Sequence, residues 1–91
     1  MRSDTGDLLQ GTLGILILKA LLAGPTHGYG IARWIEGMTD DVLRIEEGSL
    51  YPALRRLEDQ RFVKSEWGVS ENNRRARFYT ITTAGRAHLR A

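Results

Sequence analysis

The chain has 91 residues, which predicts one domain, because chains split into several domains only well beyond this length. It contains no cysteine, so disulfides, thiolate metal sites and cysteine nucleophiles are excluded. The longest apolar stretch, Ile15 to Leu18, is far below the roughly 20 residues that span a bilayer, and the N-terminal segment lacks a signal-peptide pattern. We therefore expect a soluble, cytoplasmic protein without a membrane partner.

Charge is distributed unevenly along the chain, although the formal net charge is only +2. Residues 1–47 carry four basic and seven acidic side chains, and residues 48–91 carry nine basic and four acidic ones. This asymmetry favours a basic surface for an anionic partner.

The first predicted element is a helix over residues 8–22. Apolar residues recur in it at the helical period: Leu9, Leu13, Leu16, Ile17, Ala20 and Leu21. Further apolar side chains lie on its other sides, so the helix is either central to the domain or packed against a second chain. Gly24-Pro25 ends it.

A second helix is predicted over residues 29–37, after a tight connection at residues 26–28. Ile31, Ile35 and Met38 form its inner stripe, and His27 before it is expected to pack or to cap. Residues 42–45 are β-branched or apolar and bounded by charges, which predicts one short strand.

A third helix is predicted over residues 49–60, with Ser49 as its N-cap and Pro52 in its first turn. Leu50, Leu54 and Leu57 form a single inward stripe. The opposite face carries Pro52, Arg55, Arg56 and Asp59. This helix should therefore have one buried face and one exposed basic face.

Two strands follow, over residues 62–67 and 77–82, because inward and outward residues alternate there. The polar residues 68–76 between them form a hairpin loop, and Thr83 begins a last helix. The predicted fold is mainly α with a small antiparallel sheet, a winged helix-turn-helix, in which the strand at 42–45 pairs with the hairpin.

The third helix carries the first candidate site. The major groove of DNA admits one helix, whose N-terminal residues contact base edges. The outward or flanking residues there are Ser49, Tyr51, Pro52, Arg55 and Arg56. Arginine can bind guanine through two hydrogen bonds, and serine or tyrosine can bind a phosphate. The alternative is an ordinary amphipathic helix with a solvated arginine face.

The hairpin loop, or wing, carries the second candidate site: Asn73, Arg74, Arg75 and Arg77. Such a loop can follow phosphates or enter the minor groove, or it can be merely solvated. Tyr29, at the start of the second helix, is a candidate phosphate contact.

Enzyme motifs are missing from the sequence: there is no Walker lysine, no spaced metal-ligand set and no nucleophile–base grouping. We therefore expect neither catalysis nor a cofactor nor a metal. Trp34 and Trp67 are interpreted as core or sheet-face aromatics, and His88 as an exposed residue.

Four motifs in order resemble the PadR-type repressors: residues 11–21, residues 27–32 (HGYGIA), residues 47–58 (EGSLYPALRRLE), and residues 67–79 with the Thr-Thr-Ala-Gly of residues 82–85. The resemblance covers residues 8–86. It implies a dimeric repressor on a pseudo-palindromic operator, relieved by a small aromatic effector. Residues 1–84 would be the winged-helix DNA-binding domain, and residues 85–91 the start of a C-terminal dimerisation helix.

A winged-helix domain that binds another protein, and no nucleic acid, is the alternative. A protein-binding face would be more apolar and less charged than the arginines at positions 55, 56, 74, 75 and 77. The sequence therefore favours a sequence-specific DNA-binding regulator.

Overall fold

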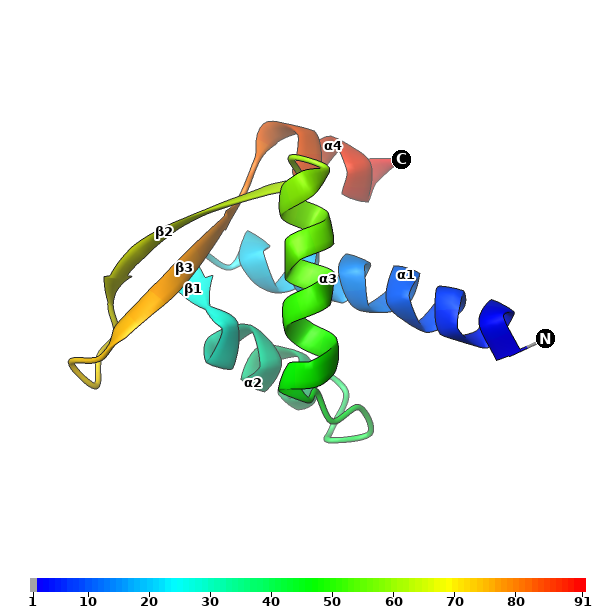
Figure 1. Ribbon diagram of the computed structural model, residues 1–91, viewed down its shortest axis with the longest axis horizontal. Coiled ribbons are helices and arrows are strands. Elements are labelled where there is room, and N and C mark those ends of the chain that lie inside the picture. The colour runs from blue at the N-terminus through cyan, green and yellow to red at the C-terminus, as the bar shows by residue number, and fades with distance from the viewer. Residues whose placement is uncertain (1) are drawn as a thin grey trace.

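The computed structural model describes residues 2–91, with side chains from Gly11 onward, and has four helices and three strands in this range (Figure 1). In chain order they are α1 (Arg2–Leu22), β1 (Thr26–His27), α2 (Gly28–Met38), α3 (Glu47–Asp59), β2 (Val63–Val69), β3 (Arg75–Ile81) and α4 (Thr83–Arg90). This confirms the predicted winged helix-turn-helix. Leu9 of the expected apolar stripe lies outside the described side chains.

The second half of α1 is the centre of the core, as its apolar residues on several sides predicted. Ile17 and Leu18 are completely buried, and α1 contacts α2, α3, α4 and β3. The core is completed by Ile31 and Ile35 of α2, the leucine stripe of α3 and Val63 at the base of β2. Burying these side chains holds α3 across the front of the domain in Figure 1 and leaves its other face exposed.

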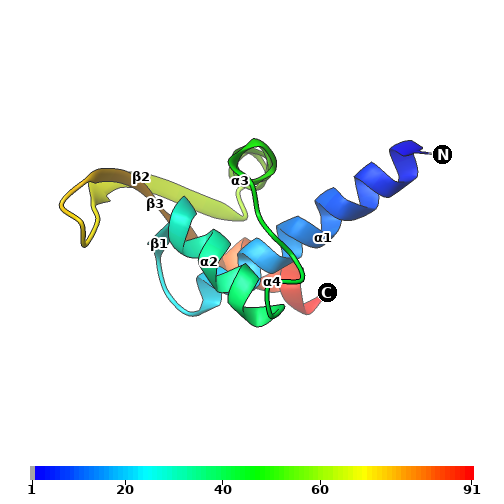
Figure 2. The same cartoon turned by 90° about the horizontal axis from the view of Figure 1, so that it is seen from below.

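The sheet has the order β1-β3-β2 and is antiparallel throughout. The pairing of β2 with β3 runs from Val63 opposite Ile81 to Val69 opposite Arg75. The strands are longer than predicted, so the loop of the wing spans only residues 70–74. Figures 1 and 2 show this hairpin projecting away from the helices to one side. The third strand is Thr26–His27, before α2, and pairs with β3.

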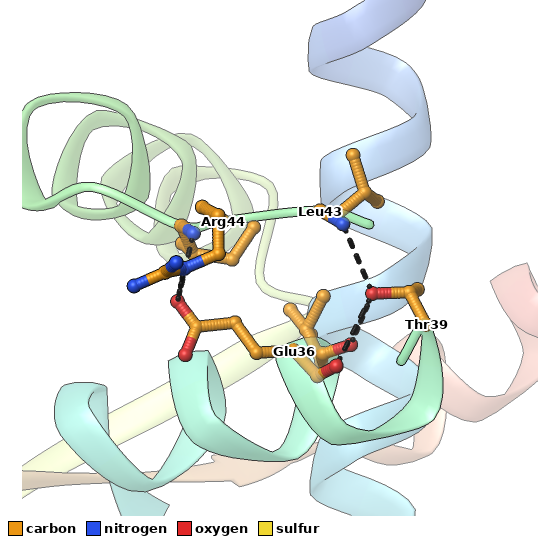
Figure 3. Close-up of polar contacts among 6 residues, drawn as sticks. Glu36, Thr39, Leu43 and Arg44 are labelled. Atoms are coloured by element: carbon orange, nitrogen blue, oxygen red, sulfur yellow. Dashed lines mark hydrogen bonds and ion pairs between the residues drawn. The ribbon is translucent and has the colours of Figure 1, made fainter. Parts of the chain in front are cut away.

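The predicted strand at residues 42–45 is wrong, because side chains of α2 and of its C-cap Thr39 accept hydrogen bonds from the backbone of this segment (Figure 3). The N–H of Leu43 donates to Thr39 Oγ1 at 3.1 Å, and the N–H of Ile45 donates to the Glu36 carboxylate at 3.0 Å. Just before them, Asp40 and Asp41 have φ angles of 51° and 63°, which end the helical path abruptly. The β-branched composition was therefore overridden by local hydrogen bonds.

The start of α3 also differs from the prediction. The helix begins at Glu47, its N-cap is Glu46 without a side-chain hydrogen bond, and Ser49 lies inside the first turn. Pro52 consequently lies within the helix and not in its first turn. At the start of α4, by contrast, the Thr82 hydroxyl accepts a hydrogen bond from the N–H of Gly85 at 3.0 Å.

Candidate nucleic-acid interface

The exposed side of α3 carries the residues that the sequence singled out. Leu50, Ala53, Leu54 and Leu57 are buried. The predicted site residues of this helix are all exposed: Ser49, Tyr51, Pro52, Arg55 and Arg56. Because only one stripe of α3 is buried, the opposite face of the helix is available to a partner. In Figure 2, α3 lies at the outside of the domain.

A hollow of about 750 Å³ is lined by residues of α3, of the wing and of the start of α2. Five of the predicted site residues line it: Tyr29, Tyr51, Arg74, Arg75 and Arg77. The Tyr51 ring lies directly against the backbone at Gly28, where a Cβ would be only 2.6 Å from the Tyr51 hydroxyl oxygen. The fold thus gathers residues from three separate segments around one concave surface.

The tip of the wing is a short turn that presents its polar side chains to solvent. Asn73 has a φ of 60°, a conformation that asparagine tolerates better than most residues, and its N–H donates to the Ser70 carbonyl at 2.8 Å. The N–H of Ser70 donates to the Arg74 carbonyl at 2.8 Å and closes the loop. The exposed side chains of Asn73 and Arg74 therefore stand at the end of a hydrogen-bonded hairpin.

Trp67 was interpreted from the sequence as a core or sheet-face aromatic, and it lies on the sheet with 56% of its surface exposed. The guanidinium carbons of Arg75 and Arg77 lie 4.7 and 5.4 Å from its ring centroid. A tryptophan face attracts such cations, so the ring holds both arginines over the hollow. Sequence reasoning missed this role, since only the cross-strand register, with Trp67 opposite Arg77, reveals it.

Arg77 is also tied to α3. Its Nε donates to Ser65 Oγ at 2.9 Å, and Ser65 Oγ donates to the Glu58 carboxylate at 2.6 Å. The Arg77 guanidinium and the same carboxylate are 3.8 Å apart. This chain of contacts joins the wing to α3. Beside it, burial raises the pKa of the Tyr79 phenol.

His27 links α2 to the wing. Its Nδ1 accepts a hydrogen bond from the N–H of Gly30 at 3.1 Å, so it is the N-cap of α2, one of the two roles predicted for it. Its ring packs edge-on against Phe78, and its Nε2 lies 3.6 Å from the Glu71 carboxylate. The pKa of Glu71 is lowered because its own backbone N–H and then the His27 side chain hydrogen-bond to the carboxylate.

Neither arginine of α3, Arg55 or Arg56, lines the 750 Å³ hollow. Arg56 lines a smaller hollow of about 190 Å³ on the other side of α3, beside α1 and His88 of α4. His88 is exposed, as predicted, and stacks on Phe62 with a centroid distance of 4.3 Å. Arg33 was not singled out in the sequence, yet it is exposed on α2 with its guanidinium 5.8 Å from the Tyr29 ring centroid.

Among the residues described, no three His, Asp or Glu side chains gather in a way that could hold a metal ion. No helix in the same part of the chain is long and apolar enough to cross a membrane.

The fold and this surface define a winged helix-turn-helix domain with an arginine-bearing wing. The family model of the Transcriptional regulator PadR-like family matches residues 17–91, and the chain belongs to this family of transcriptional regulators.

Individual proteins are similar to this chain in sequence or in fold. "Uncharacterized protein X" of Lysinibacillus sphaericus is 30% identical over 83 residues, which are 91% of this chain and 76% of that protein. A transcriptional regulator from Clostridium thermocellum superimposes with a TM-score of 0.81 at 34% identity, over 92% of this chain and 81% of that one. Bacillus subtilis PadR in complex with operator DNA superimposes with a TM-score of 0.75 at 24% identity, over 87% of this chain and 45% of that one.

Proposed function

We propose that this chain is a sequence-specific DNA-binding repressor that acts as a homodimer on a pseudo-palindromic operator. The observation that carries the proposal is the position of the exposed face of α3 beside a wing whose arginines line the same hollow. A helix can enter the major groove while such a wing follows the adjoining backbone.

Each group of predicted residues has a role in this proposal. Arg55, on the side of α3 opposite its buried stripe, contacts base edges, and Ser49, Tyr51, Pro52 and Arg56 flank it. Tyr29 contacts a phosphate from the start of α2, and the wing contributes Asn73, Arg74 and Arg75. Arg77, already hydrogen-bonded to Ser65, contributes mainly by holding the wing in place.

The fold similarity to Bacillus subtilis PadR, which was solved with operator DNA, supports a DNA partner. The proposal includes a cytoplasmic location and a binding function without catalysis, in keeping with a family of transcriptional regulators. Relief of repression by a small aromatic effector, and a dimerisation role for residues 85–91 at the end of the winged-helix domain, complete the proposal as the family resemblance implies them.

Selection of bound DNA from a random duplex library with the purified protein tests this proposal. We expect enrichment of a two-fold symmetric sequence, since a homodimer presents α3 twice. If no DNA sequence were enriched and a protein bound to the α3 face instead, the alternative of a protein-binding module would be supported.

A further inference from the structure

Three glycines of this domain are explained by close contacts within the protein itself. A Cβ at Gly28 would lie 2.6 Å from the Tyr51 hydroxyl, and one at Gly68 would lie 2.9 Å from the Phe78 ring. A Cβ at Gly85 would meet the Phe62 carbonyl. At these positions the missing side chain lets elements of the fold approach one another.

Gly48 has no such explanation. It is exposed in the first turn of α3, and a Cβ there would meet no described heavy atom within 4 Å. Its φ angle is not positive, since Gly24 is the glycine with that conformation in the described chain. Glycine within a helix is destabilising relative to alanine, so neither packing nor backbone conformation accounts for it.

The backbone of Gly48 lies where helical hydrogen-bond partners are missing. Its N–H belongs to the first turn, where helical acceptors are missing, and the side chain of Glu46 caps none of these groups. Its carbonyl loses the donor four residues later, because that residue is Pro52, which has no N–H. A donor and an acceptor without their usual helical partners thus belong to an exposed position that lacks a side chain.

Gly48 and Pro52 are one turn apart on the side of α3 opposite the buried stripe, and Arg55 follows on the same side. Directly opposite the buried stripe, the N-terminal half of α3 therefore carries only Gly48 and Pro52, and Tyr51 lies toward the hollow. The helix is thinnest at the place where base edges would be read.

We infer that Gly48 is a positioning residue of the DNA interface: without a Cβ, the first turn of α3 approaches the floor of the major groove at backbone contact distance. This inference rests on the proposed DNA-binding function. A methyl group at position 48 would keep the helix from its full depth in the groove, and Arg55 would then miss its base edge. Nonspecific complexes depend on phosphate contacts of the wing and do not need this depth.

The test compares Gly48→Ala and Gly48→Leu in the full chain, with the sequence selected by the wild type and with a random duplex of equal length. We expect Gly48→Ala to raise the melting temperature of the protein by a few degrees. The same variant should nevertheless bind the selected sequence about tenfold more weakly than the wild type. Gly48→Leu should bind the selected sequence more weakly still, and the affinity of both variants for the random duplex should change little.

Gly37→Ala is the matched control. Gly37 is also helical and exposed, and a Cβ there would meet no described atom within 4 Å, but it lies near the end of α2 and outside the hollow. We expect this variant to gain stability and to bind the selected sequence like the wild type.

Three results would overturn the inference: wild-type affinity in Gly48→Ala, an equal loss in Gly37→Ala, or an equal loss on the random duplex. Failure of the proposed function itself would be distinguishable, because the wild type would then select no sequence at all.

Discussion

Arg77 donates a hydrogen bond from its Nε to Ser65 Oγ, 2.9 Å away on the neighbouring strand, and through Ser65 it is connected to Glu58 of α3. The guanidinium is thereby shared between the Trp67 ring, a hydroxyl and a carboxylate. Of the three arginines in the wing, Arg77 is consequently the one whose contacts serve the fold most directly.

The wing arginines should therefore differ in the salt dependence of DNA binding. Removing one arginine that neutralises a phosphate reduces the log–log slope of affinity against salt by about 0.9 units. We expect Arg74→Ala and Arg75→Ala to flatten the slope by about this amount per subunit, with base preference retained. Fluorescence anisotropy at several salt concentrations, on selected and random DNA, measures both quantities.

Arg77→Ala should behave differently. We expect a smaller change in slope and a loss of about 0.5 kcal/mol in the free energy of unfolding, since an exposed hydrogen-bonded ion pair contributes little. Arg86→Ala removes one exposed charge from α4 and is the control. A full-unit change in slope at unaltered stability would show that Arg77 contacts phosphate directly.

The two arginines in the C-terminal half of α3 should be unequal in base recognition. Arg55 lies opposite the buried stripe, whereas Arg56 lines the hollow beside α1. We expect Arg55→Ala to reduce the free energy of binding to the selected sequence by about 1–3 kcal/mol. It should also relax the base preference at one or two positions of that sequence. Arg56→Ala should cost less. If both variants select the same sequence as the wild type with equal affinity, α3 does not enter the groove as proposed.

The cap at His27 should be measurable as stability. His27 Nδ1 accepts the Gly30 N–H, and loss of an N-cap costs about 1 kcal/mol. We expect His27→Ala to lower the free energy of urea unfolding by this amount and His27→Asn to restore most of it, because asparagine is also a good cap. Equal losses in the two variants would mean that packing against Phe78, and not the cap, is the main contribution.

The first helix should take part in a homodimer. Leu22 at the end of α1 is 49% exposed, and Leu89 on α4 is only partly buried. We expect sedimentation at micromolar concentration to give a dimer and Leu22→Glu to shift it towards monomer. Val42→Glu, at an 82% exposed position of the loop after α2, is the control. A wild-type monomer, with and without DNA, would contradict this prediction.

Local patterns were sufficient for most of the architecture. The 3.6-residue period of apolar side chains predicted a core helix ending at Leu22 and the buried stripe of α3, and alternation predicted β2 and β3. These predictions hold because the periodicity of a helix or strand is a property of neighbouring residues, and one buried face is enough to impose it.

The tertiary structure alone decided which short segment became the third strand. Residues 42–45 had the composition of a strand, but Glu36 and Thr39 bound their N–H groups, and Thr26–His27 paired with β3 instead. The same holds for the surface: whether Arg77 meets Ser65, and whether Arg56 faces the wing or α1, depends on register and on the packing of α3. Side-chain bonds from Thr39 and Glu36 set the path of residues 42–45, and pairing and packing between elements set the surface positions. No helical or strand period encodes either of them.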